Sequence, residues 1–180
     1  MRQPEPEQVV LVDDEDRDVG SEEKLAAHRS GALHRAFSVL LLDSAGRILL
    51  QRRALTKYHS AGLWSNACCG HPRPGEAVDA AARRRLREEM GIDCPLREVL
   101  TFRYRADVGS GLVENELDHV YVGEFDGAPA PDPAEVSEWR WVSLPELEAS
   151  IAVAPAEYTA WLPLLLRELR ARRLAPAPTR

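Results

Sequence analysis

The chain of 180 residues is 44% hydrophobic and has 29 acidic against 23 basic side chains, a net charge of -6 without a basic stripe, which argues against a nucleic-acid partner. Its apolar runs are far shorter than the roughly 20 residues of a membrane-spanning helix, and residues 1–8 have no signal-peptide core, so we expect a soluble, cytoplasmic protein without membrane insertion. Its three cysteines, two of them adjacent, form no disulfide framework, and we expect free thiols.

The two ends of the chain, residues 1–8 and 175–180, are polar and contain proline, so we expect them to be flexible. Residues 9–174 then form a single domain. Within it, residues 36–43 and 47–51 are short apolar runs separated by a Ser-Ala-Gly turn, and this pattern predicts a hairpin.

A helix is predicted over residues 76–90, ending at Gly91, because apolar residues recur on one stripe. The stripe consists of Val78, Ala82, Leu86 and Met90. Strands are predicted over three segments rich in aromatic and branched residues, namely 98–105, 114–125 and 138–142.

Two more helices are predicted near the end of the chain. Ser143 and Glu146 have the spacing of a capping box, so a short helix follows them. Residues 155–173 contain an amphipathic helix, with the inward side chains Trp161, Leu164, Leu165 and Leu169. This order of elements predicts an α/β (α+β) fold, a mixed β-sheet sandwiched between helices.

The first of these helices carries a spaced motif. Gly70 is followed by five residues, Glu76, seven residues and the run RRLREEMGI over residues 84–92. This pattern resembles the Nudix box G-x5-E-x7-R-E-U-x-E-E-x-G-U at every defined position but Arg85, where Nudix hydrolases carry a glutamate that helps to hold metal and activate water. The resemblance implies a Nudix-like fold whose helix presents carboxylates to a divalent cation and a diphosphate. A solvated face with i,i+4 ion pairs is the simpler interpretation of the charged run alone.

Four further segments resemble the type I isopentenyl-diphosphate isomerases, which have a Nudix-like fold. They are residues 52–57 (RRALTK), 65–72 (SNACCGHP), 102–105 (FRYR) and 113–116 (VENE). The resemblance extends from about Leu25 to Trp161. It implies an isomerase of isoprenoid biosynthesis that converts isopentenyl diphosphate reversibly to dimethylallyl diphosphate by protonation and deprotonation through a carbocation-like intermediate.

The resemblance also implies roles for individual residues. Cys69 and Glu116 are the facing acid/base pair, Tyr104 hydrogen-bonds the glutamate, and Trp161 faces the developing cation. Taken alone, Cys69 would be interpreted as a small buried hydrophobic residue, as we interpret Cys68.

A metal site is expected around two carboxylates. Glu114 and Glu116 are two residues apart, so on a strand they project from the same face. By resemblance, three histidines complete the site around one divalent ion, Mn²⁺, Mg²⁺ or Zn²⁺: His28, His34 and His71. The spacing from His28 to His34 is one residue shorter than in the family. A zinc site built on the adjacent cysteines is disfavoured, because adjacent cysteines rarely chelate one ion.

By the same resemblance, four basic residues bind the diphosphate: Lys24, Arg53, Lys57 and Arg85. A second ion, Mg²⁺, bridges the diphosphate to Glu89 and the carbonyl of Cys69. Arg85 then supplies a cation to phosphate oxygens in place of the hydrolase glutamate. Ordinary solvated surface is the alternative for Lys24 and Lys57. His59 and His119 are interpreted as packing residues.

Two other functional classes stay open at this stage. One is a Nudix pyrophosphohydrolase acting on a nucleotide, against which Arg85 argues. The other is a non-catalytic diphosphate-binding or zinc-stabilised module. The expected partner is a small isoprenoid diphosphate, with the chain as a monomer or, alternatively, a dimer.

Overall fold

The structure is a computed structural model that describes residues 7–174. Its elements in chain order are β1 (Gln8–Val12), β2 (Asp18–Glu23), α1 (Lys24–Ser30), β3 (His34–Leu42), β4 (Ile48–Arg53), β5 (Trp64–Asn66), β6 (Cys68–Gly70), α2 (Val78–Met90), β7 (Leu96–Gly109), β8 (Leu112–Glu124), β9 (Val136–Val142), α3 (Leu144–Val153), the 3₁₀ turn η1 (Pro155–Glu157) and α4 (Trp161–Ala171). The tail 175–180 lies outside the described residues. β1 begins at Gln8, inside the terminus expected to be flexible. No described helix is long and apolar enough to cross a membrane.

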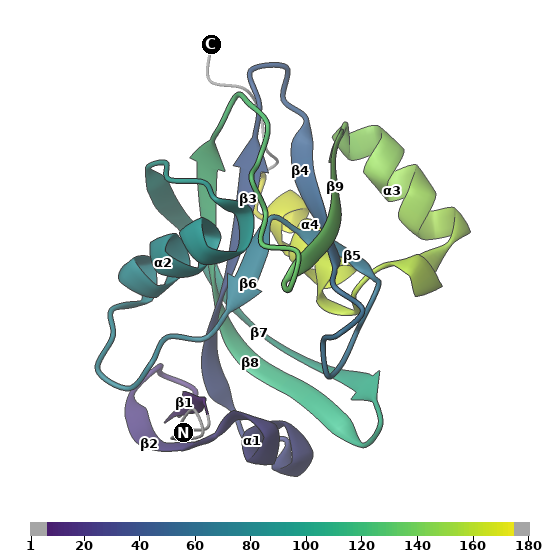
Figure 1. Cartoon of the computed structure of the whole chain (residues 1–180). Coiled ribbons are helices and arrows are strands. Elements are labelled where there is room, and N and C mark those ends of the chain that lie inside the picture. Colours follow the sequence, from purple (N-terminus) through teal and green to yellow (C-terminus); the bar gives the residue numbers. More distant parts are fainter. Residues whose placement is uncertain (1–6, 175–180) are drawn as a thin grey trace.

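Helices cover both faces of the nine-stranded sheet, α2 on one face and α3 with α4 on the other (Figure 1). The alternation of side chains along β3 explains this arrangement. Phe37, Val39 and Leu41 pack in the cluster that contains α2, whereas Leu40 and Leu42 pack in the cluster that contains α4. The prediction of a mixed sheet sandwiched between helices is confirmed.

Strand β3 is the centre of the sheet. It runs parallel to β8 over nine residue pairs and antiparallel to β6. The expected hairpin with β4 forms only at its turn, where Leu42 pairs with Ile48. Beyond that pair the prediction is wrong, because β3 is already paired with β6 and β8 and β4 turns away to pair with β5 and β9. The sheet therefore opens between these strands.

Helix α2 starts two residues later than predicted, at Val78, and ends as predicted at Gly91. Gly91 has a φ of 66°, and a Cβ at this position would lie 2.6 Å from the carbonyl oxygen of Ala130. The chain can approach so closely because glycine has no side chain. Two backbone bonds follow from this approach, from Ala130 N to Met90 O and from Asp132 N to Glu89 O, both 3.0 Å. They dock the segment before β9 on the end of α2.

The strands predicted over 98–105, 114–125 and 138–142 are β7, β8 and β9, and the capping box of Ser143 and Glu146 starts α3. The helix predicted over 155–173 is interrupted, because the backbone N–H of Thr159 donates to Trp64 O at 2.9 Å and holds this part of the chain extended. The helix resumes as α4, which buries Trp161, Leu165 and Leu169 as predicted. Leu164 is only partly buried.

The close packing at Gly91 generates a stability prediction. We expect Gly91→Ala to lower the free energy of unfolding by about 2–4 kcal/mol, because the left-handed conformation costs a residue with a side chain about 1–2 kcal/mol and the new methyl group meets a backbone carbonyl. Gly75→Ala is the matched control, since Gly75 has a φ of 79° and no atom within 4 Å of the place that a methyl group would occupy. Urea unfolding at neutral pH measures both. Equal losses in the two variants would contradict the role of the Ala130 contact.

Candidate active site

The site is organised around Glu116 on β8. In the sheet, Glu116 pairs with His34 of β3 on one side and with Tyr104 of β7 on the other. The hydroxyl of Tyr104 donates to Oε2 of Glu116 at 2.6 Å, and Nε2 of His34 lies 3.5 Å from Oε1. Glu114 lies two residues earlier, so its side chain projects from the same face of the strand.

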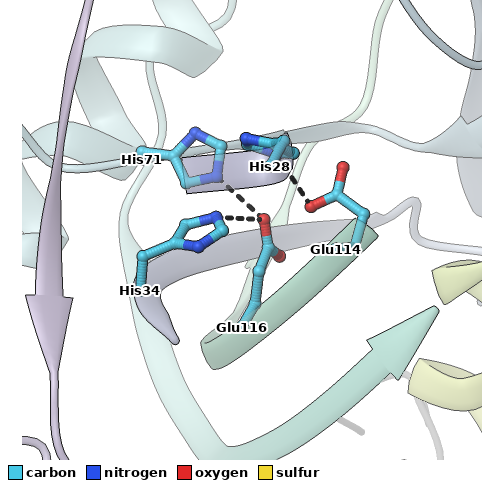
Figure 2. Close-up of side chains that lie close together, drawn as sticks. All are labelled: His28, His34, His71, Glu114 and Glu116. Atoms are coloured by element: carbon cyan, nitrogen blue, oxygen red, sulfur yellow. Dashed lines mark hydrogen bonds and ion pairs between the residues drawn. The ribbon is translucent and has the colours of Figure 1, made fainter. Parts of the chain in front are cut away.

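Three histidines and these two glutamates converge (Figure 2). Nε2 of His71 lies 2.8 Å from Oε1 of Glu116, and Nε2 of His28 lies 3.2 Å from Oε2 of Glu114. One nitrogen or oxygen atom from each of the five residues lies within 4.8 Å of all the others, and all five residues are buried. The structure therefore brings together every residue expected at the His/Glu metal site, His28 included.

Hydrogen bonds at the outer edge of this cluster orient two of the rings. Nδ1 of His28 lies 2.6 Å from the carbonyl of Lys24, and Nδ1 of His34 lies 2.8 Å from the carbonyl of Ala32. Because a carbonyl only accepts, each Nδ1 carries the proton, and in a neutral ring Nε2 is left with its lone pair. Both lone pairs then face carboxylate oxygens, which are also acceptors.

A cation between these acceptors removes the conflict. Nε2 of His34 has no hydrogen-bond partner among the described residues, although it is buried. A set of three imidazole nitrogens and two carboxylates suits a divalent ion, and backbone carbonyls behind the rings are the usual outer support for such ligands. A proton on His28 can substitute in part for the cation. Burial lowers the pKa of His28, but Glu114 outweighs burial and raises this pKa above its ordinary value. The five residues thus fit a bound metal ion.

The two adjacent cysteines point to opposite faces of the sheet. Cys68 is buried in the cluster under α2, which supports its interpretation as a packing residue. Cys69 pairs with Ser38 of β3 and lies on the other face, in the same pocket as Glu116 and Trp161. The alternation of side chains along β6 separates the two thiols.

The two groups of the expected acid/base pair differ in protonation. Burial raises the pKa of the Cys69 thiol to about 12, so the thiol is protonated at neutral pH. Burial would also raise the pKa of Glu116, but a protonated His34 ring, Glu114 and the hydroxyl of Tyr104 outweigh it and lower this pKa to about 2. A cation in the cluster would act in the same direction as the proton on His34. One pocket therefore holds a proton donor and a proton acceptor.

Eleven of the expected site residues line this single pocket: Lys24, Arg53, Lys57, Cys69, His71, Arg85, Glu89, Tyr104, Glu114, Glu116 and Trp161. The other two, His28 and His34, belong to the cluster of Figure 2 and are fully buried. Arg53 is buried with its guanidinium 5.4 Å from the centre of the Trp161 ring. The interpretation of Lys24 and Lys57 as ordinary surface is disfavoured by their place in the pocket wall.

Four residues of the pocket wall or its ion pairs were not expected from the sequence: Glu7, Tyr58, His59 and Glu135. Glu135 forms ion pairs with both Lys57 and Arg85, the latter at 3.1 Å, and Arg85 also contacts Glu89 at 2.5 Å. The sequence offers a signal for Tyr58 and His59 alone, since they directly follow the segment 52–57.

Known proteins resemble this chain in sequence and in fold. The NUDIX domain model matches residues 32–162. An isopentenyl-diphosphate Delta-isomerase of Burkholderia multivorans is 56% identical over 155 residues, which cover 86% of this chain and 88% of the relative. An isopentenyl-diphosphate Delta-isomerase of Serratia proteamaculans is 48% identical over 168 residues, with coverage of 93% and 94%.

Solved structures share the fold. DR0079 from Deinococcus radiodurans superposes with a TM-score of 0.77 at 24% identity and covers 90% of this chain and 98% of its own. A MutT NUDIX hydrolase from Burkholderia pseudomallei gives a TM-score of 0.60 at 23% identity, with coverage of 75% and 96%. The fold is thus that of Nudix proteins, while the sequence relatives favour the isomerase over the hydrolase alternative. The chain belongs to the isopentenyl-diphosphate Delta-isomerase family within the Nudix proteins.

Proposed function

We propose that this chain interconverts isopentenyl diphosphate and dimethylallyl diphosphate, with Cys69 and Glu116 as the two groups that exchange protons with the substrate. The observation that carries the proposal is a partly buried thiol and a buried carboxylate in one pocket, in a chain that belongs to the isopentenyl-diphosphate isomerases. The pKa of about 12 for Cys69 and of about 2 for Glu116 supports a pair with one proton between them.

The reaction requires a proton to be added to the terminal alkene carbon and another to be removed from the neighbouring methylene. The first transfer leaves a centre that resembles a tertiary carbocation, and the second forms the new double bond. One group of the pair loses a proton and the other gains one, so the substrate keeps its composition and charge. In the reverse direction the two groups exchange roles.

Trp161 supports the cation-like intermediate. Its ring is buried, and its Nε1–H donates to Ser65 Oγ at 3.1 Å and to Asn66 Oδ1 at 3.2 Å, so the orientation of the indole is fixed. An indole face attracts positive charge, and its contact with Arg53 is of this kind. A closed, aromatic wall also keeps water away from a carbocation that water would trap.

The diphosphate is bound by the four basic residues of the pocket wall: Lys24, Arg53, Lys57 and Arg85. Mg²⁺ bound by Glu89 and the Cys69 carbonyl would neutralise phosphate charge, since hard oxygen ligands suit this ion. Glu89 contacts Arg85 in the structure, so the same carboxylate serves both cations. A second ion, Mn²⁺, Mg²⁺ or Zn²⁺, would be held by the five residues of Figure 2 and would supply the positive charge that orients the Glu116 carboxylate.

We propose that residues 9–174 form one domain, and that the enzyme acts in the cytoplasm as a monomer, without a nucleic-acid partner. The net charge of -6 supports the last point.

Proton transfer by Cys69 is tested in deuterated water. We expect the unmodified chain to introduce deuterium into the methyl group of dimethylallyl diphosphate that forms from the terminal alkene carbon, and Cys69→Ala to lower the rate at least about 100-fold, because proton transfer by a positioned group contributes about 100- to 10,000-fold. NMR of the product measures both. Cys68→Ala is the matched control and should keep the activity, because Cys68 points to the other face of the sheet. A fully active Cys69→Ala variant would show that Cys69 is not one of the pair.

Metal dependence is tested by chelation. Removal of divalent ions should abolish the proton exchange, and Mn²⁺, Mg²⁺ or Zn²⁺ should restore it. Added ion at about 100 times its dissociation constant should also raise the free energy of unfolding by about 2.7 kcal/mol, because it binds only the folded chain. Urea unfolding with and without ion measures this shift. The shift should disappear in His34→Ala and persist in His119→Ala, whose ring contacts Asp16 and Glu98 instead. Unchanged activity in protein shown to be free of metal would refute the metal site.

A further inference from the structure

The loop of residues 54–63, between β4 and β5, carries a fourth histidine to the metal cluster. We call this segment the 54–63 loop. Its ends are joined by backbone bonds between Arg53 and the residues Gly62 and Leu63, and its outer side chains are open to solvent, with Leu55 79% and Tyr58 45% exposed. His59 is 9% exposed and points inward. A buried polar side chain next to exposed neighbours indicates a specific contact.

That contact is with Glu114. Nε2 of His59 lies 3.2 Å from Oε1 of Glu114, and Nδ1 of His59 lies 3.2 Å from the hydroxyl of Ser60. The hydroxyl of Ser60 can donate to Nδ1, unlike the carbonyls behind His28 and His34, so Nε2 of His59 can carry the proton and direct it at the carboxylate. His59 can therefore face the cluster with a hydrogen-bond donor.

The other rings behave in the opposite way. In His28 and His34 the proton is on Nδ1 and the lone pair of Nε2 points into the cluster. The five atoms that converge within 4.8 Å come from the residues of Figure 2 and do not include His59. His59 can thus take the tautomer of a residue that supports a ligand, whereas the carbonyls behind His28 and His34 give these two rings the tautomer of ligands themselves.

We infer that His59 is a positioning residue, which holds Oε1 of Glu114 so that Oε2 stays directed at the cation and thereby couples the 54–63 loop to the metal site. The inference rests on the metal site of the proposed function. Oε2 of Glu114 faces Nε2 of His28 at 3.2 Å, so each oxygen of this carboxylate has its own partner. Lys57 lies two residues before His59 in the same loop and lines the pocket. An ion bound by Glu114 would therefore also order, through His59, one of the four basic residues proposed to bind the diphosphate.

Packing is the competing explanation for a buried ring. The centre of the His59 ring lies 4.4 Å from the centre of the Tyr58 ring and 6.1 Å from the centre of the Trp161 ring, and both pairs are edge-on. Two substitutions separate the explanations. His59→Gln keeps an N–H donor at a similar reach and loses the ring, whereas His59→Phe keeps a ring and loses the donor.

Two quantities are measured on the full chain, the dissociation constant for Mn²⁺ by calorimetry and the hydrogen exchange of the 54–63 loop with and without Mn²⁺. In the unmodified chain we expect Mn²⁺ to slow exchange in the loop. His59→Phe should weaken Mn²⁺ binding about 10-fold or more, as loss of an outer partner of a metal ligand typically does, and should remove the slowing of exchange. His59→Gln should stay within about threefold of the unmodified chain and keep the slowing. His119→Gln controls for the loss of a histidine remote from the pocket.

The inference is overturned if His59→Phe matches the unmodified chain, or if His59→Gln performs no better than His59→Phe. An unmodified chain that binds no Mn²⁺ would contradict the proposed metal site instead. In that case the contact between His59 and Glu114 is tested by the hydrogen exchange of the 54–63 loop measured without metal. Faster exchange in His59→Phe than in both the unmodified chain and His59→Gln supports it, and equal exchange in all three overturns it.

Discussion

The structure depends on the burial of two carboxylates, Glu114 and Glu116, on one face of one strand. Removing a charged group from water costs several kcal/mol, and the cost is recovered only where donors or cations surround the charge. The surroundings of these side chains meet that requirement. Tyr104 donates to one oxygen of Glu116, and Nε2 of His59 lies 3.2 Å from one oxygen of Glu114. The histidine nitrogens of Figure 2 converge on the remaining oxygens in an arrangement that suits a cation. The proposed metal site and the carboxylate proposed to transfer protons are therefore one structural unit.

This chain keeps the Nudix fold but differs from the Nudix hydrolase motif in the charge of a side chain at the pocket wall. Arg85 replaces the motif's glutamate by a cation and contacts Glu89 and Glu135 at the pocket wall. In the proposed function, a carboxylate for metal and water is thereby exchanged for a cation that attracts phosphate oxygens. In the same pocket, Cys69 is the residue that we propose to exchange a proton with a carbon of the substrate. The same sheet and helix can hold a diphosphate in both kinds of enzyme, while the side chains around it determine which bond changes.

The parts of this structure that follow from local patterns could be predicted from the sequence. The apolar stripe of α2 and the capping box of α3 depend on residues a few positions apart, and both were confirmed. Strands β5 and β6 have three residues each, and their pairing with distant strands leaves no periodic signal. For the same reason His59 was missed, because its partner Glu114 lies far along the chain. The segments that resemble the isomerase family located most of the pocket, since a family motif carries information about distant contacts.

As a facing pair, Cys69 and Glu116 would act from opposite sides of the substrate's carbon chain. A crystal structure with an unreactive analogue of isopentenyl diphosphate and divalent cations would show the positions of both groups. We expect the Sγ of Cys69 and the carboxylate of Glu116 on opposite faces of the bound alkene, with a metal ion among the five residues of Figure 2. Both groups on the same face of the chain would contradict the mechanism.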